Sequence, residues 1–164
     1  MKLYIRQKLF SIVDKFTIKN EHLEDIYFGH GKFFTIAKQL TITDNDNQEV
    51  LFLKEQLWHF FPHIDVHMKN QSSFLVKKRF AFFTQKYEIT SLNWEVEGNF
   101  WAHQYRIFNE NGTIATIEKA WLSLSDYYEV DIVDPKDTLA ILGIVLAIDI
   151  AMSKAAAANN SSSH

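Results

Sequence analysis

A short run of cations is the strongest candidate for a ligand-binding site in the sequence. Lys77, Lys78 and Arg79 are consecutive, and Lys86 follows closely. On a β-strand, Lys77 and Arg79 would share one face, because successive side chains point to opposite sides. Lys77, Arg79 and Lys86 are therefore the predicted ligand-binding residues, suited to the phosphate of an anionic lipid headgroup. The alternative interpretation is a solvated strand whose charges protect a sheet edge.

Several other patterns resemble known sites but predict little chemistry. Lys2, Arg6 and Lys8 form a second, weaker basic cluster. Asp44, Asp46 and Glu55 match ligand positions of a calcium-binding loop, but the loop glycine is missing, which favours a hairpin turn. The segment from Gly29 to Lys32 resembles part of a phosphate-binding loop without its upstream glycine, and we expect a turn there as well.

Three polar residues alternate with apolar ones in a way that could support a metal. His63, Asp65 and His67 would lie on one face of a strand, and histidine and carboxylate are common metal ligands. Ile64 and Val66 would then occupy the opposite face. No further ligand can be named, so we interpret the three residues as solvent-facing and predict no metal site.

The remaining signatures of catalysis are missing from the sequence. The 164 residues include no cysteine, which excludes disulfides, thiolate nucleophiles and cysteine-bound zinc. No Gly-x-Ser-x-Gly or His-Glu-x-x-His motif occurs, so we predict no catalytic residue and no cofactor. The net charge of −3 gives no general attraction to nucleic acid. Charges interrupt the first residues, where a signal peptide would be apolar, which favours a cytoplasmic protein, peripheral at the membrane if it binds lipid.

The elements that must position these residues follow a repeated pattern. Four windows of sixteen residues align without gaps, at 3–18, 51–66, 74–89 and 115–130. Each is predicted to be a strand, an apolar connection and a second strand, with alternating apolar residues facing a core. The connections contain bulky side chains such as Leu57, Trp58, Phe60 and Phe61, which we expect to fold back over the sheet because exposed aromatic clusters favour aggregation.

Further strands are predicted between the windows, which brings the total to twelve. They fall at 25–28, 40–43, 94–97 and 104–108, with turn-forming residues at 44–47 and 109–112. The chain then forms two six-stranded halves, 3–70 and 74–133. A closed antiparallel barrel would remove every sheet edge, and a barrel of this size needs something in its middle.

An apolar helix is predicted to fill that space. Asp134 and Pro135 form a good helix start, and the residues that follow, as far as Met152, are apolar on all sides. The apolar stretch is shorter than the roughly 20 residues of a membrane span, so we expect a buried helix over 135–152, with a lipid-inserted helix as the alternative. Asp149 interrupts it, either at the barrel mouth, where it meets water or a base, or as a buried anchor or ligand contact. Residues 153–164 are predicted to be a flexible tail beyond a single domain, 1–152.

This combination resembles the bacterial branch of the LURP-one-related family. The segments KLYIRQKLFS, KYEITSLNWEVEGNFWAHQYRI and the terminal YEVDIVD followed by TLAILGIVLAID are similar to that family over almost the whole chain. The resemblance implies a tubby-like barrel, similar in fold to phospholipid scramblases, and contact with phosphoinositides or other anionic membrane lipids. It supplies no catalytic residues.

Three functions remain open from the sequence. The first is a non-enzymatic binding module that recognises anionic membrane lipids. The second is a soluble scaffold for a protein partner or a small ligand, without a membrane role. The third is a scramblase-like protein, which would require a membrane-inserted helix.

Overall fold

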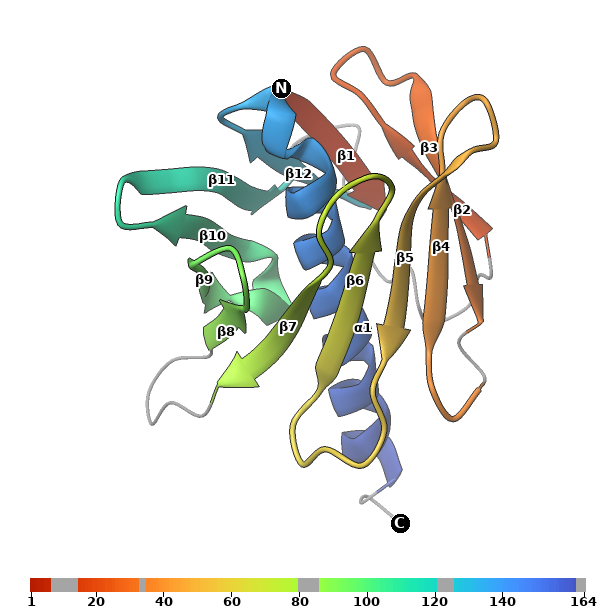
Figure 1. Ribbon diagram of the computed structural model, residues 1–164, viewed down its shortest axis with the longest axis vertical. Helices are drawn as coiled ribbons and strands as arrows, with labels where there is room; N and C mark the ends of the chain where they lie inside the picture. Colours follow the sequence, from red (N-terminus) through yellow and green to blue (C-terminus); the bar gives the residue numbers. More distant parts are fainter. Residues whose placement is uncertain (7–14, 33–34, 80–85, 121–125, 162–164) are drawn as a thin grey trace.

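The computed structural model describes residues 1–6, 15–32, 35–79, 86–120 and 126–161. Twelve antiparallel strands form a closed barrel around one long helix, α1 (Figure 1). The predicted fold class is therefore confirmed. The strands are β1 (Lys2–Arg6), β2 (Lys15–Lys19), β3 (Asp25–Lys32), β4 (Gln39–Thr43), β5 (Glu49–Glu55), β6 (His63–Met68), β7 (Phe74–Arg79), β8 (Lys86–Ile89), β9 (Trp94–Asn99), β10 (Gln104–Asn109), β11 (Gly112–Lys119) and β12 (Tyr127–Ile132).

Each strand pairs with its neighbours in the chain, and β1 closes the barrel against β12. The closing register places Leu3 opposite Val130 and Ile5 opposite Tyr128. All four of these side chains are buried, because alternation sends every second residue of a strand toward the interior. The predicted strands and the turns at 44–47 and 109–112 lie where the structure has them. The middle columns of three repeat windows fall on 7–14, 80–85 and 121–125, outside the described residues.

The segment from Gly29 to Lys32 differs from its prediction. It is the end of strand β3 and not a turn. Gly29 lies opposite Phe16 of β2, and a Cβ atom at Gly29 would be 2.3 Å from the Phe16 ring. The glycine is therefore explained by an aromatic ring that covers the backbone of the neighbouring strand, which no isolated sequence motif reveals.

The interior of the barrel is filled by α1 (Thr138–Ser161), which follows the short 3-10 helix η3 (Pro135–Asp137). Asp134 caps this start, as predicted, by accepting a hydrogen bond from the backbone N–H of Lys136 at 3.1 Å. By length and composition alone, Pro135–Asn159 could cross a membrane. Its residues from Ile141 to Ala147 are nevertheless buried against the strands, so the prediction of a buried helix is confirmed.

The helix is longer than the sequence pattern indicated. It continues to Ser161, whereas the prediction ended it at Met152 and made the rest a tail. The extra turns contain four consecutive alanines, Ala155–Ala158, and alanine is the residue with the highest helix propensity. The helix therefore extends beyond its buried part at the end of the barrel opposite the N-terminus (Figure 1).

Candidate functional site

The β5–β6 loop, residues 56–62, exposes two large aromatic side chains. Trp58 is 99% exposed and Phe60 is 96% exposed. The prediction that this connection folds back over the sheet is therefore wrong for these two residues. The base of the loop is fixed, because the backbone N–H of Gln56 donates to the carbonyl of His63 at 2.9 Å. The Gln56 side-chain amide also donates to the carboxylate of Asp65 at 2.9 Å.

Other exposed apolar residues lie at the same end of the barrel. Ile36, in the connection from β3 to β4, is 87% exposed, and Trp101, in the 3-10 helix η1 (Phe100–Ala102) between β9 and β10, is 53% exposed. Odd-numbered strands all run toward this end, so every connection from an odd strand to the next even strand belongs to it. We call it the aromatic end. Figure 1 shows the β5–β6 loop near the C-terminal end of α1.

Cations lie at this end on strands to both sides of β4–β6, although β4, β5 and β6 themselves have none as their last residue there. Six of the twelve strands have a lysine or arginine as their last residue at the aromatic end. We call these six residues the basic ring: Arg6, Lys15, Lys32, Arg79, Lys86 and Lys119. All but Lys86 are exposed. Two of the six have carboxylate partners: Arg79 Nε lies 3.0 Å from Glu88 and Lys86 Nζ lies 3.6 Å from Glu97. Within the part of the chain that the structure describes, the other four form no ion pair.

The opposite end of the barrel, which we call the polar end, is acidic. Its turns and strand ends contain Glu21, Glu24, Asp25, Asp44, Asp46, Glu49, Glu110, Asp134 and Asp137. Its lysines are largely neutralised: Lys19 Nζ lies 2.6 Å from Asp25, and Lys136 Nζ lies 2.7 Å from Asp134. Each of these contacts lowers the pKa of the aspartate. The polar end therefore has more carboxylates than the aromatic end, where the exposed residues Glu118 and Asp126 lie beside the cations.

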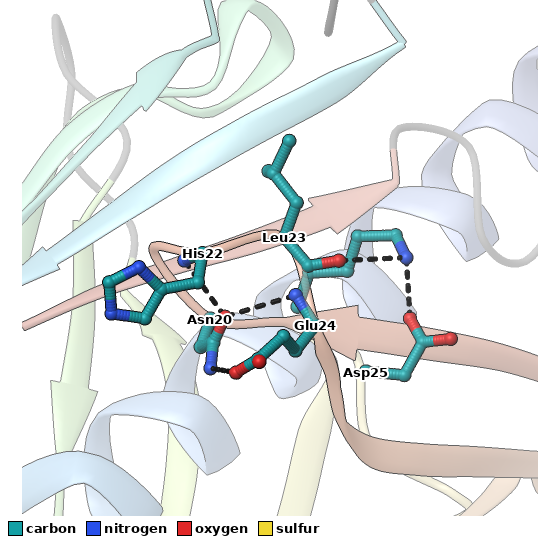
Figure 2. A network of polar contacts seen from close by, with 6 residues as sticks. Asn20, His22, Leu23, Glu24 and Asp25 are labelled. Atoms are coloured by element: carbon teal, nitrogen blue, oxygen red, sulfur yellow. Dashed lines mark hydrogen bonds and ion pairs between the residues drawn. The ribbon is translucent and has the colours of Figure 1, made fainter.

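Compact polar turns build this end. Figure 2 shows the β2–β3 turn, where the side-chain carbonyl of Asn20 accepts hydrogen bonds from the backbone N–H of His22 at 2.9 Å and of Glu24 at 3.0 Å. Asp44 makes the equivalent contacts in the β4–β5 turn, with the N–H groups of Asp46 and Gln48. Such side-chain contacts replace the missing backbone partners of a turn, which explains why asparagine and aspartate occur there.

Side chains of α1 contact the aromatic end from inside the barrel. Glu55, the last residue of β5, is only 2% exposed, and its carboxylate accepts a hydrogen bond from Lys154 Nζ at 2.5 Å. Lys38 Nζ donates to the Ser153 hydroxyl at 2.6 Å. Burial lowers the pKa of Lys38, an effect that Glu55 opposes and Lys154 reinforces. These contacts link the helix to the end of β5 and to the β3–β4 connection, and they turn the Lys38 ammonium toward α1.

A second polar cluster connects α1 to the barrel wall. The Tyr128 hydroxyl donates to Asp149 Oδ2 at 2.6 Å, and His103 Nε2 lies 3.5 Å from Asp149 Oδ1. The His103 ring stacks on Tyr128 with 4.4 Å between centroids. Asp149 thus links the helix to Tyr128 and to the base His103 while its side chain stays 12% exposed, which agrees with elements of both interpretations of the sequence.

Two more tyrosines extend this cluster. Burial, reinforced by the nearby Asp149 carboxylate, raises the pKa of Tyr87, Tyr105 and Tyr128. The Tyr105 hydroxyl is buried and has no hydrogen-bond partner among the described residues. The interior near Asp149 is therefore rich in neutral phenols around one carboxylate, an arrangement that fixes the helix without presenting a reactive group to solvent.

The predicted ligand-binding residues lie together on the outer surface of the barrel. Register places Lys77 opposite Glu88 and Arg79 opposite Lys86 across the β7–β8 pair. Glu88 and Glu97 supply carboxylates beside them, which reduces the positive potential of this face. Arg79 and Lys86 are nevertheless members of the basic ring, so two of the three predicted residues belong to the candidate surface.

The other predicted clusters are separated by the fold. Lys2 and Arg6 lie at opposite ends of β1, with Lys2 paired to Glu129 at 2.6 Å, and Lys8 lies outside the described residues. His67 Nδ1 lies 2.9 Å from the Ser73 hydroxyl, while the His63 ring contacts His59. Across 1–6, 15–32, 35–79, 86–120 and 126–161, no group of three or more histidine, aspartate or glutamate side chains could hold a metal.

The basic ring was missed because its members are scattered through the sequence. Only the strand order brings Lys15, Lys32 and Lys119 to one end of the barrel. A signal was nevertheless available in the alternation of connections, since 56–62 is aromatic whereas 44–48 and 69–73 are polar. In an up-and-down barrel, alternate connections lie at opposite ends, so this pattern predicts two ends of different character.

Comparison with known proteins supports the fold. A family model described as LURP-one-related matches residues 1–149. The protein YxjI of Bacillus subtilis (strain 168), described as uncharacterised, is 25% identical over 152 residues, which cover 93% of this chain and 94% of that protein. An X-ray structure of a protein from Arabidopsis thaliana superposes with a TM-score of 0.60 over 90% of each chain, and its 11% identity restricts the similarity to the fold.

Proposed function

The chain belongs to the LURP-one-related family, and from its surface we propose that it is a non-enzymatic module that binds anionic membrane lipids. The single observation that carries this proposal is the basic ring at the same end of the barrel as the exposed side chains of Trp58 and Phe60. Cations next to exposed aromatic residues are suited to a surface that is anionic outside and apolar beneath, as a bilayer leaflet is.

The charge distribution also supports a defined orientation. The whole chain has a net charge of −3, so an anionic membrane repels it on average. Because nine acidic residues lie in the turns and strand ends of the polar end, attraction is strongest when the aromatic end faces the lipid. Each lysine or arginine close to an anionic surface contributes about 1 kcal/mol, so the four cations that form no ion pair with a described residue are enough for measurable and salt-sensitive binding.

The internal contacts of α1 argue against the scramblase-like alternative. A helix that left the barrel would have to break the contacts of Asp149 with Tyr128 and of Lys154 with Glu55. It would also expose the apolar interior that α1 now covers. A peripheral role, in which the barrel stays closed, requires neither change.

The test is co-flotation of the purified protein with vesicles. Vesicles of neutral phosphatidylcholine are compared with vesicles that also contain phosphatidylglycerol or a phosphoinositide, at low and at high salt. We expect binding to the anionic vesicles only, weakened by salt because exposed charges are screened. Equal binding to both anionic compositions would indicate attraction to surface charge, and preference for the phosphoinositide would indicate a headgroup site.

Matched variants locate the binding surface. Lys15→Glu with Lys32→Glu changes the basic ring, whereas Lys69→Glu with Lys136→Glu makes the same change of net charge at the polar end. We expect the first variant to lose binding and the second to keep most of it. Lys77→Glu with Arg79→Glu tests the outer face that the sequence predicted. Failure of the unmodified protein to bind any vesicle would overturn the proposal and favour the soluble scaffold.

A further inference from the structure

We propose that the aromatic end inserts Trp58 and Phe60 into the bilayer, so that the barrel stands on the membrane with the C-terminal end of α1 toward the lipid. This inference rests on the proposed function and adds the mode of contact. Insertion is a separate claim, since cations alone could hold the protein at the headgroups without any apolar contact. The structure favours insertion for three reasons, which concern the loop, its support and its surroundings.

The loop exposes Trp58 and gives it an unusual backbone conformation. Trp58 has φ 67°, in the left-handed region that bulky residues rarely adopt. Exposed Leu23 at the polar end has the same conformation, with φ 63°, so the backbone alone does not distinguish the two ends. What distinguishes Trp58 is an indole ring that is 99% exposed to water, which transfer to a lipid interface would cover. Tryptophan prefers this interface because its ring is apolar and its N–H group can still donate to a polar partner.

The loop is supported firmly enough to present its side chains. The pairing of Gln56 with His63 and Asp65 closes its base. Lys78 of β7 adds a backbone hydrogen bond to the carbonyl of Pro62 at 3.4 Å. Phe60 packs edge-on against Phe61 with 5.1 Å between ring centroids, so the two rings form one apolar unit.

The charges around the loop favour lipid as the occupant of this surface. A second copy that docked through the same end would bring two basic rings together, and facing like charges oppose association. Anionic headgroups would instead surround the inserted rings with charges of the complementary sign. The aromatic end therefore fits a bilayer better than it fits another molecule of this chain.

The experiment compares apolar variants at the two ends of the barrel. Trp58→Ser with Phe60→Ser removes the proposed anchor and leaves the basic ring intact. Val133→Ser with Leu23→Ser is the matched control, because these two exposed apolar residues lie at the polar end. On anionic vesicles at low salt, we expect the first variant to partition at least about tenfold more weakly and the control to partition like the unmodified protein, since two large aromatic surfaces leave water on insertion.

Depth is measured with brominated lipids, which quench nearby tryptophans. Quenching of the unmodified protein should exceed that of Trp58→Phe. Insertion would be overturned if Trp58→Ser with Phe60→Ser bound normally and Trp58→Phe were quenched like the unmodified protein. If Lys15→Glu with Lys32→Glu still lost binding, the proposed function would remain. A native dimer in lipid-free solution that Trp58→Ser with Phe60→Ser converts to monomer would also overturn it, because a second copy would then be the occupant.

Discussion

Two of the tyrosines near Asp149 have hydroxyl groups in different situations. The Tyr128 hydroxyl donates to the carboxylate at 2.6 Å, whereas the Tyr105 hydroxyl is buried without a partner in the described structure. Both side chains are buried, with Tyr105 5% and Tyr128 0% exposed, and both belong to the same core. Substitution of each tyrosine by phenylalanine keeps the aromatic ring, so the two changes in the free energy of unfolding isolate the contribution of one buried hydrogen bond.

We predict opposite outcomes for the same substitution at these positions. Tyr128→Phe should lower the free energy of unfolding by about 1.5–3 kcal/mol, because it removes a hydrogen bond to a carboxylate that stays buried. Tyr105→Phe should leave stability unchanged or raise it by up to about 1 kcal/mol, because the lost hydroxyl has no partner. Urea unfolding followed by circular dichroism measures both. A larger loss in Tyr105→Phe than in Tyr128→Phe would contradict this assignment of the hydrogen bonds.

At the scale of the elements, α1 packs closely against β6 at Gly143. A Cβ atom at this position would lie 2.6 Å from Val66 Cγ1 of β6, while its contacts to Phe74 and Leu51 would be ordinary at 3.5 and 3.7 Å. The glycine thus reflects the distance between helix and strand and not a turn. Val66 is fully buried, so its methyl group has little space to move away.

The effect of Gly143→Ala should therefore depend on residue 66. In the unmodified protein, crowding of about 1–3 kcal/mol outweighs the gain in helix propensity of about 1 kcal/mol, so the substitution should be destabilising. In a Val66→Ala background the crowding is relieved, and Gly143→Ala should become stabilising by up to about 1 kcal/mol. Thermal unfolding of the four proteins of this double-mutant cycle checks the change of sign. The same sign in both backgrounds would show that the helix is not in close contact with β6 here.

The elements themselves were largely predictable, for reasons that particular segments illustrate. Alternation in 127–132 sets both the strand and the face it buries, and the Asp134–Pro135 cap sets the start of the helix. The end of the helix was missed because apolar periodicity stops at Met152 while helix propensity does not. The exposure of Trp58 was missed because the prediction assumed that large apolar side chains are buried away from water.

The candidate surface belongs to the scale of the whole molecule. No single strand contains it, and its cations are brought together only when β1 pairs with β12. Up-and-down order then sorts alternate connections to two ends, which can acquire different compositions without disturbing the shared interior. This separation explains how one small barrel has an aromatic, basic end and a polar, acidic end around the same core. The relation to tubby proteins and scramblases stays a prediction, because the structural comparison concerns the barrel alone.

The interior tyrosines give the whole molecule a characteristic response to alkali. Burial raises the pKa of Tyr87, Tyr105 and Tyr128 in the folded protein, whereas an unfolded chain releases these protons near pH 10. Above that pH the unfolded state binds fewer protons than the folded state, so the free energy of unfolding falls as pH rises. Below about pH 9 both states keep these protons, and the three phenols contribute no pH dependence.

We therefore predict a steep loss of stability above about pH 10. Each of the three phenols contributes a slope of about 1.4 kcal/mol per pH unit once the unfolded chain is ionised, so together they approach about 4 kcal/mol per unit. Urea midpoints between pH 8 and 11 measure the slope, and tyrosinate absorbance shows whether ionisation coincides with unfolding. Tyr105→Phe is the control, because it should remove about one third of this slope while the fold is kept. Ionisation of all six tyrosines of the still-folded barrel near pH 10 would contradict the prediction and would mean that water reaches the interior around Asp149.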